Sequence, residues 1–475
     1  MSREIVRESR QDAKVKNDFS KGSIPKTILR LSVPMTVAQL INILYNMVDR
    51  MFIGHMPGDG RLALTGVGIT MPIITILIGF ANLCGMGGSP LSAMARGRDD
   101  MDEAESIMGN AFSMLLILGV ALTAIGLLIK RPLLYLFGAS DDTFPYANAY
   151  LTVYLLGTIM VMISLGMNPF INSQGFAKIG MLTVTIGAVT NVILDPILIY
   201  ACHMGVRGAA LATIIAQTVS AVWAFSFLTG KRAIMRLRLN KLRLRAKTVG
   251  RIVSLGISNF TLHFTTCLVQ SLCNKQLQIH GGDLYVSVMT VINSIREFGF
   301  AAINGVTNGS SPVISFNYGA QRYDRIRETI RVLTISAFGC AFIWWALTLT
   351  IPDKLISIFN RDPELIAAGV PAFRIYFMVF GLTAFQLSGQ VTFLSLGKSK
   401  KAIFFSMLRK AIIVTPLVLI LPHLWGLGVK GIFLSEPISI IVSGLACYIT
   451  MFCTVYIPMG KMMKEQSPDK LPDTQ

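Results

Sequence analysis

Two polar residues lie inside an apolar segment of this chain, where ionisable groups are costly. Asn191 and Asp195 are four residues apart in the run 178–202, so they share one face of a helix. Pro196 follows, and because proline lacks an N–H, the carbonyl of Val192 loses its usual helical donor. An ionised carboxylate at mid-bilayer costs about 3 kcal/mol on insertion scales, so such residues usually mark an ion or substrate path. The run therefore predicts a site for a hard cation or a proton.

Three further oxygen-bearing side chains are expected at the same depth. Asp49 lies near the outer end of the first apolar run, and Tyr150 and Thr213 lie about seven residues into the fourth and sixth. Five oxygen donors without thiolates or histidines suit a hard cation such as sodium better than zinc or iron. A proton is the alternative, since burial and a neighbouring acid both favour a neutral carboxyl group. We predict a cation-coupling site formed by Asp49, Tyr150, Asn191, Asp195 and Thr213, in which Asp49, Asn191 and Asp195 would hold sodium.

A structural role for the two acids is the competing interpretation. Arg50 could neutralise Asp49, and Asp195 could make only a structural hydrogen bond. Neighbouring residues on a helix point about 100° apart, which weakens the first of these two explanations.

The elements that must position these residues are membrane-spanning helices. The chain has 475 residues, is 53% hydrophobic and only 14% charged, and has a mean hydropathy of +0.59, which is typical of an integral membrane protein. About 20 apolar residues span the hydrocarbon layer. The sequence predicts twelve spans, at 27–53, 62–92, 106–130, 143–172, 178–202, 206–229, 249–280, 285–316, 326–351, 363–394, 400–422 and 428–457.

The net charge of +18 reflects how the chain is oriented across the membrane rather than a nucleic-acid partner. With the N-terminus inside, 28 of the 43 Lys and Arg residues fall in inner loops and tails and seven in outer loops. The positive-inside rule therefore predicts a multi-pass protein of the cytoplasmic membrane with both termini in the cytoplasm. Residues 1–23 are polar and lack an apolar signal region, so no cleaved signal peptide is expected.

A repeat with an offset of 222 residues divides the chain into two halves. The offset pairs Pro90 with Pro312 and Gly97 with Gly319, and it aligns GGSPLSAMARGRDDMD with GSSPVISFNYGAQRYD. Two halves of six spans each insert in the same orientation, which predicts two six-helix lobes related by pseudo-twofold symmetry about the membrane normal. The predicted divisions are a cytoplasmic tail at 1–26, an N-lobe at 27–229, a basic linker at 230–248, a C-lobe at 249–457 and a cytoplasmic tail at 458–475.

The cation cluster itself is not repeated. The offset places Ser271, Ala372, Ile413, Leu417 and Ser435 where the first half has Asp49, Tyr150, Asn191, Asp195 and Thr213. The fold therefore does not require these oxygens, as expected if they serve a function.

The second half offers candidates for contact with substrate. Arg296 and Glu297 lie near mid-membrane with Phe298 and Phe300 nearby, and these four residues are the predicted substrate-binding group. Glu297 could hold a cationic substrate or merely neutralise Arg296 or Lys275. Two outer-half residues, Glu436 and Arg374, are expected to form a structural ion pair.

Two other features complete the prediction. Pro34 lies in the first span fifteen residues before Asp49 and is the hinge candidate, with a static kink as the alternative. The linker region Lys231–Arg251 carries nine basic residues and is expected to contact anionic lipid, with a regulatory or partner-binding role as the alternative. Phosphate-loop, HExxH and GxSxG motifs are absent from the sequence, so we expect a protein that is not an enzyme and has no cofactor beyond a coupling ion.

These motifs together resemble the multidrug and toxic compound extrusion (MATE) family over nearly the whole chain. The resemblance rests on PMTVAQLINILYNMVDRMFIG, GGSPLSAMARG and GSSPVISFNYGAQ. It implies the all-α, twelve-helix fold of two lobes and an exporter that exchanges drugs for protons or sodium. In members with a first-lobe cation site, the DinF-like and MepA-like type, the ligands match Asp49, Tyr150, Asn191, Asp195 and Thr213, and the bending proline matches Pro34.

The branch with its cation site in the second lobe fits less well, because it uses acids on the seventh and tenth helices. Here those helices carry Gln270, Lys275 and Gln386 and no carboxylate. We therefore predict a cation-coupled multidrug antiporter that exports organic, mainly cationic amphipathic compounds by alternating access and functions as a monomer. The alternative is a flippase for a lipid-linked saccharide.

Overall fold

The structure is a computed structural model that describes residues 17–56, 60–359, 361–424 and 426–465. Most of the two predicted tails, 1–26 and 458–475, lies outside the described residues. All regular elements of the described part are helical, and their contacts divide the chain into two units. The first unit comprises the described residues of 1–18, 37–93 and 100–264, and the second comprises those of 19–36, 94–99 and 265–475.

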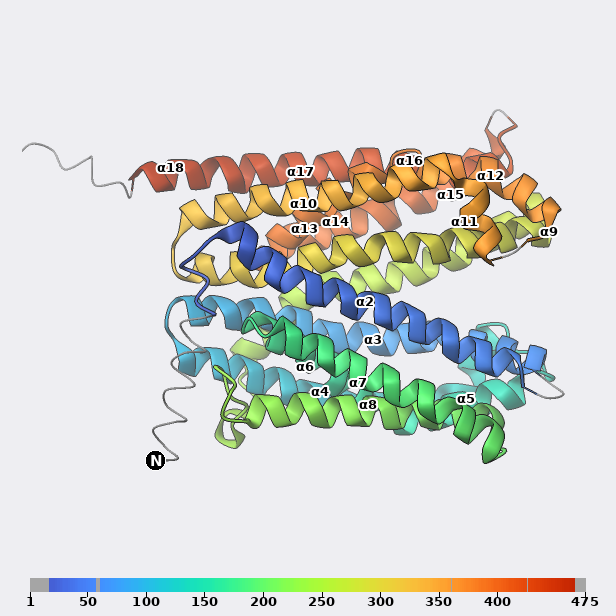
Figure 1. The fold of residues 1–475 in the computed structure, drawn as a ribbon, viewed down its shortest axis with the longest axis horizontal. Helices are drawn as coiled ribbons and strands as arrows, with labels where there is room; N and C mark the ends of the chain where they lie inside the picture. The colour runs from blue at the N-terminus through green and yellow to red at the C-terminus, as the bar shows by residue number, and fades with distance from the viewer. Residues whose placement is uncertain (1–16, 57–59, 360, 425, 466–475) are drawn as a thin grey trace, which may run out of the picture. The chain divides into compact units, whose positions relative to one another are not determined.

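Long helices running side by side build the first unit (Figure 1). After the part of α2 (Ile24–Gly54) that belongs to it, the elements are α3 (Gly60–Gly97), α4 (Met101–Leu136), α5 (Phe144–Leu156), α6 (Thr158–Ser173), α7 (Ala177–Pro196), η1 (Ile197–Ala201), α8 (Gly205–Thr229) and η2 (Leu239–Lys241). The predicted fourth span is the pair α5 and α6, which bends by 60° at Gly157.

One element, α9 (Ala246–Gly319), contains two predicted spans. Its 74 residues would form a rod of about 110 Å, far longer than the roughly 30 Å hydrocarbon layer. Gly282 interrupts it with φ +68° and ψ −168°, a left-handed backbone that glycine adopts without steric cost. The break lies between the predicted spans 249–280 and 285–316.

The second unit has the same plan with more interruptions. Beyond α9 it contains α10 (Tyr323–Thr350), α11 (Pro352–Phe359), α12 (Pro363–Phe377), η3 (Phe380–Leu382), α13 (Thr383–Ser395), α14 (Ser399–Met407), η4 (Leu408–Val414), α15 (Thr415–Ile420), η5 (Leu421–His423), α16 (Val429–Ser439), η6 (Ile440–Gly444), α17 (Leu445–Met451), η7 (Phe452–Tyr456) and α18 (Ile457–Glu465).

The predicted number of spans is confirmed. The described residues contain ten helices long and apolar enough to cross a membrane, and the bent pair α5–α6 makes eleven. The break at Gly282 divides α9 in two, which gives twelve.

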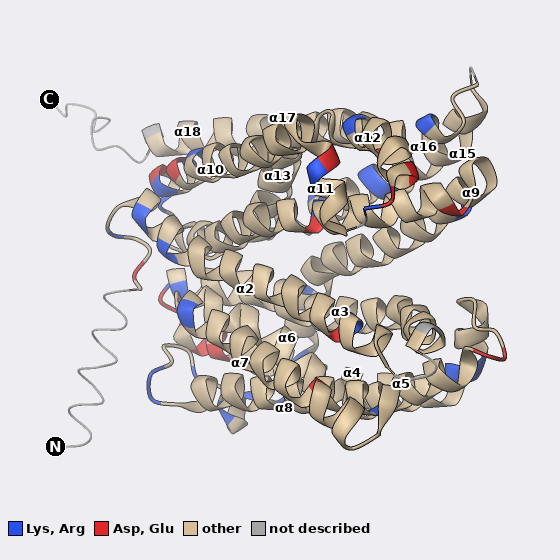
Figure 2. Cartoon of the chain, turned by 45° about the vertical axis from the view of Figure 1, so that its right-hand side comes forward, with Lys and Arg blue, Asp and Glu red and all other residues tan. Residues whose placement is uncertain are grey.

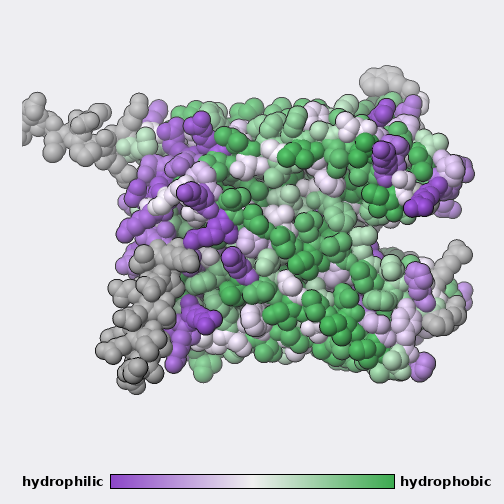
Figure 3. Space-filling model, in the orientation of Figure 1, coloured by the Kyte–Doolittle hydropathy of each residue, from purple (hydrophilic) through white to green (hydrophobic). Residues whose placement is uncertain are grey.

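The outer surfaces of the helices fit a lipid environment. Large apolar side chains such as Leu128 on α4 and Ile343 on α10 are 82% and 70% exposed. Figure 3 shows apolar side chains along the helices of both units and hydrophilic ones toward the helix ends. Most charged residues likewise lie near helix ends in Figure 2, so the few charges midway along helices stand out. The chain is therefore a multi-pass membrane protein.

The basic linker packs onto the first unit. Met235 is buried and its N–H donates to Gln174 Oε1 at 2.9 Å, while Arg238 pairs with the buried Glu105 at 2.9 Å. Lys241 pairs with Asp102, and Arg251 pairs with Glu103 at 2.6 Å. Three of the nine basic side chains of Lys231–Arg251 thus have acidic partners on α4, so the predicted contact with anionic lipid would rest mainly on the other six.

Candidate cation site

The predicted cation-coupling residues come together in the first unit. Asp49 on α2 is 6% exposed, while Asn191 and Asp195 on α7 are 1% and 0% exposed. Asn191 Nδ2 donates to Asp195 Oδ1 at 3.2 Å, as the spacing of four residues predicts. The carboxyl groups of Asp49 and Asp195 interact directly although they come from different helices. Two acids and an amide therefore form one buried cluster.

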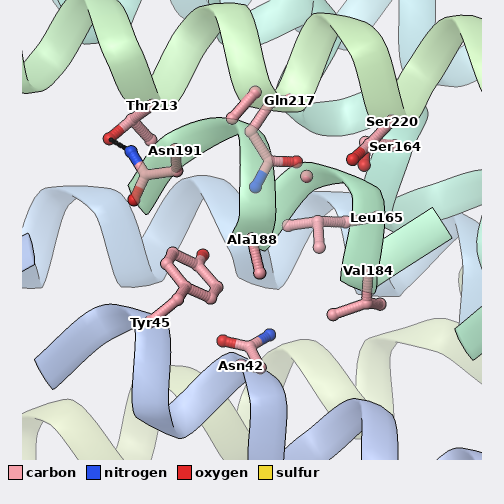
Figure 4. Close-up of a pocket in the computed structure, with 12 residues that line it drawn as sticks. Asn42, Tyr45, Ser164, Leu165, Val184, Ala188, Asn191, Thr213, Gln217 and Ser220 are labelled. Carbon is pink, nitrogen blue, oxygen red and sulfur yellow. Dashed lines mark hydrogen bonds between the residues drawn. The ribbon is translucent and has the colours of Figure 1, made fainter. Parts of the chain in front are cut away.

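Thr213 on α8 and Tyr150 on α5 complete the set. Thr213 Oγ1 lies 3.5 Å from Asn191 Nδ2 and donates to the carbonyl of Ala209 at 3.1 Å (Figure 4). Tyr150 is 3% exposed, interacts with Thr213 through its side chain, and stacks on Tyr154 with ring centroids 6.2 Å apart. All five predicted residues thus lie together.

Three oxygens of the cluster lack hydrogen-bond partners. They are Asp49 Oδ1, Asn191 Oδ1 and Asp195 Oδ2, and each is buried. A buried acceptor without a donor is costly, and two carboxylates in contact repel each other. A bound proton or an oxygen-seeking cation would relieve both costs. The donors present are carboxylate, amide and hydroxyl oxygens, which suit a hard cation better than zinc or iron.

A cavity of about 30 Å³ adjoins the cluster, with room for one or two water-sized groups. Asn191 and Thr213 line it on one side, and Asn42 and Tyr45 of α2 on the other (Figure 4). Gln217, one turn after Thr213, also faces it and interacts with Tyr45. These additional polar residues were not predicted. The signal was present, because residues 42, 45 and 49 recur at helical spacing on one face of α2.

The structural explanation for Asp49 is not supported by contacts. Arg50 is exposed on α2, and its Nη2 lies 3.9 Å from the sulfur of Met71. Among the described residues, Arg50 and Asp49 form no ion pair within 4.0 Å. Arg50 influences Asp49 electrostatically but does not occupy its free oxygen.

A known protein family has the same two-part architecture. The MatE family model matches residues 34–197 and again residues 255–420. The two matches start 221 residues apart (255 − 34) and end 223 apart (420 − 197), which confirms the 222-residue repeat. Together they cover more than half of the chain. The chain belongs to the MatE family.

Known relatives agree with this assignment. The chain is 25% identical over 437 residues to the "Multidrug export protein MepA" of Staphylococcus saprophyticus, covering 91% of the chain and 95% of that protein. A solved "Outward-facing conformation of a multidrug resistance MATE family transporter of the MOP superfamily" superposes with a TM-score of 0.87 at 22% identity, covering 94% of this chain and 98% of that one. A MOP superfamily transporter from Pyrococcus furiosus, described as having a "reverse polarity of binding pocket", gives a TM-score of 0.88 at 22% identity and the same two coverages.

Pro34, the hinge candidate of this MatE protein, lies where α2 packs tightly against α9. Pro34 is buried inside α2, between Ser32 and Thr36. A Cβ added at Gly305 of α9 would overlap Thr36, and one added at Gly309 would overlap Ser32, so α2 and α9 cross closely here within the second unit. From Val37 onward, α2 belongs to the first unit.

The predicted substrate-binding residues are not brought together. Arg296 lines a cavity of the second unit and donates to Tyr376 Oη at 2.9 Å. Glu297 is exposed, Phe300 packs edge-on against Phe380 with centroids 5.5 Å apart, and Phe298 does not line that cavity. Of the four candidates, only Arg296 reaches the cavity.

The predicted ion pair between Glu436 and Arg374 is wrong. Glu436 instead accepts from Arg409 Nη2 at 2.6 Å and from Lys410 Nζ at 3.2 Å, and all three side chains are buried. Arg374 is exposed on α12. The prediction rested on an expected common depth in the membrane, and depth does not reveal which face of a helix a residue occupies.

Proposed function

We propose that this MatE protein is a cation-coupled multidrug efflux antiporter that exports organic, mainly cationic amphipathic compounds by alternating access. The single observation that carries the proposal is the trio of unpartnered buried oxygens on Asp49, Asn191 and Asp195. The relative named as a multidrug export protein supports the substrate class.

The coupling ion would be exchanged at this oxygen cluster. Asp49 and Asp195 come from different helices, so an ion between them joins α2 to α7 and removes their mutual repulsion. Without the ion, the two carboxylates favour separation of these helices. A ligand shifts a conformational equilibrium only through its different affinity for the two states, and this repulsion supplies such a difference. Protons and sodium both satisfy this chemistry.

Pro34 offers the joint at which the helix would move. Close crossing with α9 holds α2 around Ser32 and Thr36, whereas the segment that carries Asp49 belongs to the first unit. Pro34 lacks the N–H that would bond the carbonyl of Arg30, so the helix bends most easily at this boundary. We therefore assign the hinge to Pro34.

The charges and the repeat support a membrane location, a topology and an oligomeric state. The excess of Lys and Arg in alternate loops supports a cytoplasmic membrane location with both termini inside. The unpaired basic residues of the linker would contact anionic lipid. Because one chain carries both halves of the fold, a monomer is a complete transporter.

Proteoliposome transport tests the proposal. We expect ethidium to leave vesicles containing wild-type protein when a proton or a sodium gradient is imposed, and the effective gradient names the coupling ion. Asp49→Asn and Asp195→Asn should reduce this flux to the level of empty vesicles. Leu417→Asn serves as the matched control, because it introduces the same side chain at the equivalent position of the second half. Normal gradient-driven flux in Asp195→Asn would refute the coupling site.

A flippase for lipid-linked saccharides is the second candidate, and the basic cluster of the second unit favours it. Arg296, Arg409 and Lys410 would suit a substrate that carries phosphate, but only in a conformation in which their cavity is wider than the 20 Å³ that it measures here. Movement of a fluorescent lipid-linked saccharide without any gradient, together with no flux of ethidium or of several other organic cations, would favour this candidate over the antiporter.

A further inference from the structure

The second unit contains a cavity with an unusual surplus of positive charge. It measures about 20 Å³ and is lined by Arg296, Lys410 and Glu436 together with the hydroxyl of Tyr376. Arg409 does not line the cavity but forms an ion pair with Glu436, and both side chains are buried. Three basic side chains therefore surround one carboxylate.

The carboxylate of Glu436 is already engaged. Its Oε1 accepts from Arg409 at 2.6 Å and from Lys410 at 3.2 Å, and its Oε2 accepts from Lys410 at 3.2 Å. Arg296 instead donates to Tyr376, and no carboxylate of the described residues lies within ion-pair distance of it. Even if Lys410 were neutral, two guanidinium groups would still share one buried acid, because Glu297, which acts on Arg296 through space, is exposed and forms no ion pair with it.

This imbalance needs a counter-charge. Isolated charges inside apolar surroundings are strongly disfavoured, and arginine cannot lose its proton to escape the cost. The Tyr376 hydroxyl accepts from Arg296, which leaves its own O–H free to donate into the cavity. An anion placed there would be held by two cations and a hydroxyl donor.

We propose that this cavity binds a compact monovalent anion, such as chloride, between Arg296, Lys410 and Tyr376. The volume sets the size limit, since one water-sized particle needs roughly 10–15 Å³ by the same measure. Sulfate, phosphate and organic anions are too large for this space. The anion would balance the charge of the second unit and stabilise its packing, independently of the cation site of the first unit.

Thermal unfolding of the purified full chain in chloride and in gluconate tests this assignment. At constant sodium and ionic strength, we expect chloride to raise the unfolding temperature of the wild-type protein by several degrees and the effect to saturate. Arg296→Gln should abolish the chloride effect. Arg374→Gln is the matched control, because this exposed arginine of the same unit lies outside the cavity and should leave the effect intact.

A second measurement covers the case in which Arg296→Gln fails to fold. Crystals of the wild-type protein grown in bromide should show an anomalous peak between Arg296 and Lys410. The assignment is overturned if chloride and gluconate give the same unfolding temperature, if sulfate stabilises as much as chloride, or if Arg296→Gln keeps the full chloride effect. A bromide peak absent from this cavity would also overturn it.

Discussion

The two cavities occupy equivalent places in the repeat and have opposite chemistry. Shifting by 222 residues converts Ala188 into Lys410 and Thr213 into Ser435, and each of these residues lines the cavity of its own unit. The first cavity lies beside two carboxyl groups, and the second is lined by two basic side chains and one acid. The backbone plan of the repeat thus accommodates either sign of charge.

The charged positions also differ along the equivalent helix. In the first unit, α7 carries Asn191 and Asp195, where the second unit has Ile413 and Leu417. In the second unit the charges are Arg409 and Lys410, which correspond to Gly187 and Ala188. Asp195 lies seven residues after Ala188, so the charge has moved by about 10 Å along the helix axis. A cluster of unpartnered acids is suited to a mobile cation, whereas a paired acid among bases is suited to a fixed structure.

Removing the acid of the second unit should have the largest effect. Glu436→Gln leaves Arg409 and Lys410 buried without a carboxylate, and breaking such a buried pair costs about 3–5 kcal/mol. We expect a marked fall in the unfolding temperature and in the yield of folded protein, measured by thermal unfolding in detergent.

An exposed acid of the same unit provides the control. Glu297→Gln should change the unfolding temperature by less than about 1 °C, because Glu297 is exposed and has no ion-pair partner among the described residues, so its loss leaves no buried base without an acid. If Glu436→Gln proved as stable as Glu297→Gln, the ion pairs of the second unit would not hold its structure, and the contrast between the units would fail.

Removing an acid from the first unit should instead raise the unfolding temperature. Asp195→Asn replaces a carboxylate with an amide that can donate to Asp49, so it relieves the repulsion within the cluster. At pH 8 without sodium, we expect a gain of about 1 kcal/mol, which corresponds to roughly 2–4 °C in the unfolding temperature of a domain of this size. The gain should disappear when a saturating coupling ion is added.

Leu417→Asn tests whether this gain depends on position. Leu417 is partly buried at the equivalent point of the second half, where an introduced amide meets no acid cluster. It should lower the unfolding temperature. If Asp195→Asn lowered the unfolding temperature by a similar amount, the acids of the first unit would be structural, like Glu436 of the second unit.

The sequence was sufficient to predict the cation cluster because its signal is local. Asn191 and Asp195 lie four residues apart in an apolar run, and the depth of each span places Asp49, Tyr150 and Thr213 beside them. The twelve spans follow from hydropathy in the same way. The additional contact between Tyr45 and Gln217 was missed: the spacing of Tyr45 from Asp49 indicates a shared helix face, but uncharged polar residues are common on helices, and the sequence does not show that Gln217 of another helix lies opposite.

Pairing within the second unit could not be predicted because it depends on helix rotation. Glu436 and Arg374 were expected at a common depth, yet Arg374 is exposed and Glu436 faces Arg409 and Lys410. Arg409 and Lys410 lie in the π-helical segment η4, directly after its first residue Leu408, and its altered winding changes the direction of the side chains. A prediction based on regular α-helical spacing cannot anticipate that change.

The smallest expected difference compares the two hydroxyl residues at equivalent positions. Thr213 accepts from Asn191 beside the unpartnered oxygens, so Thr213→Ala removes a hydrogen-bond partner worth about 1 kcal/mol. We expect the concentration of coupling ion at half-maximal ethidium efflux to rise about fivefold in Thr213→Ala. Ser435→Ala should leave it unchanged, because Ser435 lines the second cavity and donates to the carbonyl of Ile432. An equal rise in both variants would place the coupling ion at both cavities, and the chemical contrast between the two units would then have no functional meaning.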